Sequence, residues 1–183
     1  MIPSKQHTAL YSWENLKLLL FFVLCNLAFC KSYAQYYSFK TNDFYKNKNP
    51  KKNKVYTSWA NINGRRWDIK TDVGIKDYEY LKVGTTTDEA KYIILKTNIG
   101  IQKVKKLIVF VETSRSPKAY KAISAEILNS EIVANRSCYD NNSFSFSFEN
   151  VVNNDFLKIK IYFDTSLKTK SCIIIRSIEV TNE

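Results

Sequence analysis

Histidine is nearly absent from this chain of 183 residues, which contains His7 alone. His7 lies ahead of a long apolar run, so the rest of the chain has no Ser-His-Asp or Cys-His arrangement, histidine-ligated zinc site or histidine general base. Carboxylate chemistry remains, as a glycosidase pair or a calcium site made of oxygen ligands. No spacing among the Asp and Glu residues singles out such a pair. We expect a protein that is not an enzyme and needs no cofactor, with a structural calcium ion as an open alternative.

Charge is nearly absent from residues 16–30, which read LKLLLFFVLCNLAFC. A transmembrane helix needs about 20 apolar residues, so this run is short for a membrane span. The small-x-small pattern Ser32-Tyr33-Ala34 follows it, which is typical of a secretory signal peptide cleaved between Ala34 and Gln35. We therefore predict that residues 1–34 are a signal peptide and that the protein is secreted, periplasmic or at the cell surface. An uncleaved membrane anchor and a lipoprotein are the alternatives.

Cysteine is also scarce, and loss of the signal peptide would leave Cys138 and Cys172 out of four. An even pair of cysteines in an exported chain indicates one disulfide. In an antiparallel strand arrangement both cysteines are expected at the same end of the sheets. The sequence therefore predicts a Cys138–Cys172 disulfide, with two buried free thiols as the alternative.

The chain is strongly basic, with a formal net charge of +11. Residues 42–54 are rich in lysine and asparagine and have few apolar side chains. Such composition is typical of a flexible segment, and we predict a mobile arm over residues 35–54. The arm either contacts an anionic polymer or lipid surface or serves as a solvated spacer.

Strict alternation of apolar and polar residues predicts strands in much of the remaining sequence. Residues 143–148 read SFSFSF, and residues 157–163 alternate in the same way. In the last strand Ile173 and Ile175 share one parity and Ile178 and Val180 the other, which predicts a bulge near Arg176 and Ser177 that lets all four face the core. The pattern predicts an all-β domain over residues 55–183, an antiparallel two-sheet sandwich of eight or nine strands. Residues 116–134 fit either a helix or two strands.

Several short motifs resemble, in order, the jelly-roll modules of exported proteins from Bacteroidetes-type bacteria. The motifs are Asn63-Gly64 followed by Trp67, the turn Leu81-Lys82-Val83-Gly84, the stretch 95–104, and the closing strand 173–180. The resemblance implies a jelly roll, favours strands over residues 116–134, and implies no particular ligand. Gly84 and Gly100 are expected to provide positive φ at tight turns.

The candidate ligand-binding residues lie around the two tryptophans that remain in the predicted mature chain. Aromatic rings offer flat apolar faces to sugar rings, and nearby Arg and Asp side chains can bind hydroxyl or acidic groups. Trp67 fits the core better than an exposed platform, whereas Trp59 fits an exposed platform better. The candidates are Tyr56, Trp59, Arg65, Arg66, Trp67 and Asp68.

These observations favour an exported, non-catalytic binding module for a glycan or another extracellular polymer. The main alternative is a structural or assembly protein of the cell envelope that binds another protein. A third hypothesis is a salt-sensitive binder of nucleic acid or of another anionic polymer. Of these two ligands, we expect nucleic acid less. We expect contact with a membrane only if the signal segment stays attached.

Overall fold

The computed structural model describes residues 34–44, 55–98, 104–114, 117–128, 130–140, 142–151, 156–164 and 171–182, together with Lys17. The chain divides into two units, Met1–Ser32 and Tyr33–Glu183, and all the described strands belong to the second. The predicted signal peptide therefore lies almost entirely outside the described residues. Within the described ranges, no helix has the length and hydropathy needed to cross a membrane.

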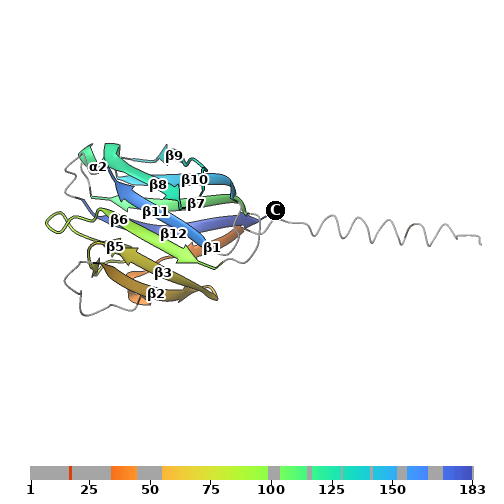
Figure 1. Cartoon of the computed structure of the whole chain (residues 1–183), viewed down its shortest axis with the longest axis horizontal. Coiled ribbons are helices and arrows are strands. Elements are labelled where there is room, and N and C mark those ends of the chain that lie inside the picture. The colour runs from red at the N-terminus through yellow and green to blue at the C-terminus, as the bar shows by residue number, and fades with distance from the viewer. Residues whose placement is uncertain are drawn as a thin grey trace, which may run out of the picture. The chain divides into compact units, whose positions relative to one another are not determined.

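The described chain forms two antiparallel sheets, which are the two layers of a sandwich (Figure 1). One sheet has five strands in the order β2-β3-β6-β11-β8. Its strands are β2 (Tyr56–Ile62), β3 (Arg65–Thr71), β6 (Tyr92–Thr97), β8 (Ile123–Ile127) and β11 (Leu157–Phe163).

The other sheet has seven strands, in the order β4-β5-β12-β7-β10-β9, with β1 also paired to β12. Its strands are β1 (Ala34–Ser38), β4 (Ile75–Lys76), β5 (Leu81–Val83), β7 (Val104–Thr113), β9 (Asn135–Cys138), β10 (Ser143–Val151) and β12 (Ile173–Asn182). β5 pairs with the first half of β12 and β1 with its second half, so both lie along the same edge of β12. Two short helices, η1 (Thr41–Asp43) and α2 (Pro117–Ala122), complete the described elements.

The core lies between the sheets. It consists of the apolar residues that alternate with polar residues along the strands. Phe144, Phe146 and Phe148 are all buried, as the SFSFSF pattern predicts. The register of β12 against β7 shifts between Ile175 and Ser177, which confirms the predicted bulge. Because of that shift, the apolar residues on both sides of the bulge are buried in one core.

The prediction of an all-β, two-sheet antiparallel sandwich is confirmed, but the strand count is wrong. The described residues form twelve strands, because short strands such as β4 and β9 carry too few alternating residues to be recognised. In residues 116–134, both interpretations hold in part. Residues Pro117–Ala122 form a helix and residues Ile123–Ile127 form a strand, which gains one further bridge between Glu126 and Val133.

The prediction of a flexible arm is wrong for residues 35–44. Strand β1 pairs with β12, and Tyr37, Phe39 and Phe44 are 2%, 0% and 3% exposed. The aromatic rings explain this difference, because their burial favours packing of a segment that otherwise reads as polar. The β-domain thus includes residues from Ala34, and residues 45–54 of the predicted arm lie outside the described part.

The predicted disulfide is also wrong, because Cys138 and Cys172 are free thiols. Both do lie at the same end of the seven-stranded sheet, as expected. However, Cys138 is on β9 and Cys172 precedes β12, and the sheet order places β10 and β7 between them. Three strand spacings amount to about 14 Å, whereas the Cα atoms of a disulfide lie within about 7 Å of each other.

We therefore expect Cys138→Ser to change the free energy of unfolding by less than about 0.5 kcal/mol. A disulfide closing the intervening loop would make the loss about 3–4 kcal/mol. In the folded protein, exposed Cys138 should react quickly with a thiol reagent. Buried Cys172 should react slowly, because burial raises the pKa of its thiol and leaves little thiolate. Recovery of a Cys138–Cys172 cross-linked peptide from unreduced protein would contradict this expectation.

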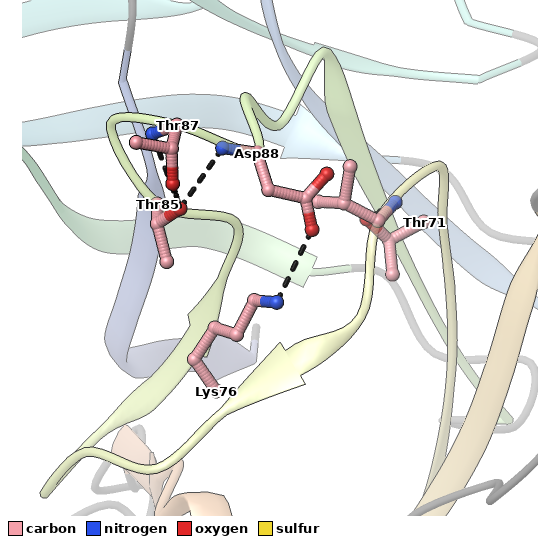
Figure 2. Close-up of polar contacts among 6 residues, drawn as sticks. Thr71, Lys76, Thr85, Thr87 and Asp88 are labelled. Atoms are coloured by element: carbon pink, nitrogen blue, oxygen red, sulfur yellow. Dashed lines mark hydrogen bonds and ion pairs between the residues drawn. The ribbon is translucent and has the colours of Figure 1, made fainter.

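Gly84 closes a tight turn at the end of β5, and its φ is +76°, as the sequence predicts. The loop after it is held by polar contacts (Figure 2). Thr85 Oγ1 accepts hydrogen bonds from the backbone N–H groups of Thr87 and Asp88, and Lys76 Nζ lies 3.1 Å from Asp88 Oδ2. A Cβ on Gly84 would lie 2.7 Å from the backbone nitrogen of Ala90. Gly100, the other glycine expected at a turn, lies outside the described residues.

Gly84→Ala should therefore destabilise the protein by about 1–3 kcal/mol, because the turn combines a positive φ with a backbone clash. Gly64→Ala is the matched control, since Gly64 has φ +74° but open space where its Cβ would lie. Chemical denaturation should show a clearly smaller loss for Gly64→Ala than for Gly84→Ala. Equal losses would mean that the contact with Ala90 costs nothing.

Candidate functional site

The candidate site is an open cavity of about 680 Å³ on the outer face of the five-stranded sheet. Alternation places one set of side chains of each strand in the core and the other set on this face. The register then brings one row across four neighbouring strands, from Trp59 to Asp68, Lys96 and Lys158. The lining residues are Thr57, Ser58, Trp59, Arg66, Asp68, Ile69, Lys70, Ile94, Lys96, Leu128 and Lys158.

Three of the lining residues form a compact group at the β2–β3 end of the cavity. The guanidinium carbon of Arg66 lies 4.9 Å from the centroid of the partly exposed Trp59 ring. Arg66 Nε donates a 2.9 Å hydrogen bond to Asp68 Oδ1, and the two side chains are 61% and 42% exposed. The second oxygen of this carboxylate and the rest of the guanidinium therefore remain accessible for hydrogen bonds to a bound molecule.

Lysines surround the centre of the cavity. Lys96 on β6 and Lys158 on β11 are direct cross-strand partners, and Lys70 on β3 lies one row along the sheet. Lys96 Nζ lies 4.0 Å from the centroid of the exposed Phe156 ring. With Arg66, the cavity has four basic lining residues and Asp68 as its acidic one.

A second cavity of about 640 Å³ lies next to the first and shares Arg66 with it. It is lined by residues of β1 and of the β2–β3 turn, and Arg65 Nη1 donates a 3.1 Å hydrogen bond to the backbone oxygen of Asn98 there. Tyr37 OH donates to Gln35 Oε1 beside it, and burial raises the pKa of the Tyr37 phenol.

The six candidate residues predicted from the sequence lie in different parts of the structure. Trp59, Arg66 and Asp68 line the main cavity, and Arg65 lines the second one. Tyr56 packs against the backbone at Gly74. Trp67 is fully buried, so its place as a binding candidate is wrong and its interpretation as a core residue is correct.

Sequence reasoning missed the lysines of the cavity, Lys70, Lys96 and Lys158. They are separated by up to 88 positions along the chain, and only the register of β3, β6 and β11 brings them together. The alternation of β11 does predict that Lys158 faces outward. It does not indicate which other strands lie beside it.

The described residues contain no group of three or more His, Cys, Asp or Glu side chains that could hold a metal ion. The site as described is therefore one aromatic ring, one carboxylate and several basic groups around an open hollow. Such an arrangement can bind a polar molecule. The aromatic ring can pack on an apolar face of that molecule, and the carboxylate and basic groups can bind its hydroxyl or acidic groups.

No family model matches the chain, and no curated protein matches it. Among solved structures, it is similar to a family 29 carbohydrate-binding module from Piromyces equi, with 14% identity over 81% of this chain and 87% of that chain and a TM-score of 0.16. It is also similar to the NetB toxin of Clostridium perfringens in its membrane-inserted form, with 10% identity over 81% of this chain and 79% of that chain and a TM-score of 0.11. Both TM-scores are far below the range in which two chains share a fold, so neither likeness indicates what this chain binds.

Proposed function

We propose that this protein is an exported, non-catalytic module that binds a glycan on the outer face of its five-stranded sheet. The observation that carries the proposal is the cavity in which the Trp59 ring lies beside Arg66 and Asp68. Export is supported by the apolar run and the small-x-small pattern that end at Ala34. The absence of catalysis is supported by the scarcity of histidine in the sequence.

The chemistry of the cavity matches a sugar ring on two sides. The apolar C–H face of a sugar packs on an aromatic ring such as that of Trp59. This contact leaves the hydroxyl groups of the sugar available for hydrogen bonds. The hydroxyl groups at the ring edge are both donors and acceptors, so they need carboxylate oxygens and N–H groups around them. Asp68 and Arg66 provide one of each within reach of Trp59.

We also propose that the sandwich is a jelly roll. The chain alternates between the sheets from β6 to β7 to β8, and again from β10 to β11 to β12. Paired strands β5-β12-β7-β10 in one sheet and β6-β11-β8 in the other are the arrangement that two interleaved Greek keys produce. In this fold the outer face of the five-stranded sheet is an open surface on which an extended polymer can lie.

A glycan array tests the proposal most simply. The protein and its Trp59→Ala variant are applied side by side to an array of neutral and acidic oligosaccharides and polysaccharides. We expect at least one family of glycans to bind the protein and to lose binding in the variant, while both remain folded by circular dichroism. A broad array with no bound glycan would reject the proposed function.

A second candidate function is assembly with another protein through a sheet edge. Strand β9 lies at one edge of the seven-stranded sheet, and all four of its side chains are exposed. Unpaired strand edges can add a strand from a partner chain. A stable homo-oligomer in light scattering, together with an array without hits, would favour this function over glycan binding.

A further inference from the structure

We propose that the glycan bound in the main cavity is anionic and that Lys70, Lys96 and Lys158 hold its carboxylate or sulfate groups. This inference rests on the proposed function, since it names the class of glycan for the same site. Its observations are the cluster of lysines and the lack of an acidic side chain within ion-pair distance of them among the described residues. Asp68, the one carboxylate that lines the cavity, is the cross-strand neighbour of Lys96 but pairs with Arg66.

The register forces the lysines together. Lys96 and Lys158 are directly opposite each other on neighbouring strands, where side chains on one face approach most closely. Lys70 is diagonal to Lys96, two residues beyond the Asp68 position on β3. Neighbouring strands are about 4.8 Å apart, so the three side chains leave the sheet within a patch about 10 Å across. Like charges placed this way repel one another, and a bound anion would relieve the repulsion.

The same face contains another lysine, which does have an acidic partner. Lys160 is two residues beyond Lys158 on β11, and its Nζ lies 2.8 Å from Glu126 Oε1. Arg66 is likewise paired, with Asp68. Among the described residues, Lys70, Lys96 and Lys158 have no acidic partner within ion-pair distance, although they line the cavity. Lysines without an acidic partner are thus gathered in the cavity, where Lys96 contacts the Phe156 ring.

The neighbourhood favours a polysaccharide over a nucleic acid. Single-stranded nucleic acids are usually bound by several aromatic rings that stack successive bases along a basic groove. In this cavity Trp59 is the one aromatic lining residue, and beside it lies the Asp68 carboxylate, which accepts hydrogen bonds from sugar hydroxyls. The combination suits a sugar chain that has both hydroxyl and acidic groups.

Matched pairs of probes test the inference. Each acidic polymer is compared with its uncharged form: polygalacturonate with carboxyl-reduced polygalacturonate, and dextran sulfate with dextran. Single-stranded oligothymidylate is the third probe. We expect an acidic member to bind on the order of tenfold more tightly than its uncharged partner. The uronate and sulfate pairs then show which anionic group is recognised.

Two variants with equal charge change locate the effect. Lys70→Gln, Lys96→Gln and Lys158→Gln combined should weaken binding of the acidic probe on the order of tenfold, because each exposed charge contact contributes a factor of about 1.5 to 5. Lys82→Gln, Lys105→Gln and Lys106→Gln combined remove the same charge from the seven-stranded sheet and should leave the affinity within about twofold.

The outcomes separate this inference from the proposed function. Equal binding of charged and uncharged partners, lost in Trp59→Ala, would overturn the inference and leave glycan binding intact. Equal weakening by both triple variants would also overturn it, because general charge would then explain the preference. Tighter binding of oligothymidylate than of every glycan would replace it with nucleic-acid binding. Failure of every glycan, charged or not, would reject the proposed function itself.

Discussion

Replacing Trp67 with alanine should lower the free energy of unfolding by about 3–5 kcal/mol. Among the described residues, Trp67 is the largest fully buried side chain, and it joins the two sheets through edge-on contacts with aromatic rings of β1 and of the residue that follows it. Its ring centroid lies 5.3 Å from that of Tyr37 and 5.1 Å from that of Phe39. Truncation would leave a large cavity and remove the surface on which β1 packs, so both costs add.

Two control variants show whether the loss is specific to the buried indole ring of Trp67. Trp67→Phe should cost clearly less, because it retains an aromatic ring and removes an indole N–H that has no acceptor among the described residues. Trp59→Ala should change the free energy of unfolding by no more than about 1 kcal/mol, because its side chain is partly exposed. Chemical denaturation of the three variants measures these differences. A Trp67→Ala loss below about 1 kcal/mol would mean that Trp67 does not anchor the core.

Replacing Trp59 with alanine should weaken glycan binding roughly 30-fold or more. Tryptophan is among the residues that most often contribute about 2 kcal/mol or more to binding, which corresponds to that factor. Trp59 is the aromatic residue that lines the cavity, which extends from it across β3, β6 and β11. The variant also removes the ring on which the Arg66 guanidinium lies, so the Arg66–Asp68 pair would lose its support.

Isothermal titration with the best glycan from the array measures this effect. Trp59→Phe should recover part of the affinity, because a smaller ring still offers an apolar face to a sugar. Thr85→Ala, in the polar loop after β5, is a suitable control and should bind the glycan normally. A Trp59→Ala protein with undiminished affinity would show that the glycan binds elsewhere.

The layers of the fold could be predicted from the sequence because alternation is a local signal. The three phenylalanines of residues 144–148 and the parity change around Arg176 each lie within one strand, and both predictions are confirmed. The core role of Trp67 follows from the same logic. Prediction failed for residues 35–44, where Tyr37 and Phe39 are too few to outweigh a polar composition read as an arm.

The site was less predictable because it depends on which strands become neighbours. Trp59, Arg66 and Asp68 belong to one hairpin, so local reading already places them together. Lys96 and Lys158 become neighbours only when β11 pairs with β6. For the cysteines the error was the opposite one. The order of strands along the chain suggested that Cys138 and Cys172 are close, but two strands lie between them in the sheet.

Backbone amide mapping by NMR tests the central claim most directly, since the claim is that one face of one sheet binds the glycan. Isotope-labelled protein is titrated with the best glycan from the array, and the shift of each backbone amide resonance is followed to saturation. We expect the largest shifts in β2, β3, β6 and β11, centred on Trp59, Asp68 and Lys96. Shifts concentrated in the seven-stranded sheet, or spread evenly over both sheets, would contradict the account.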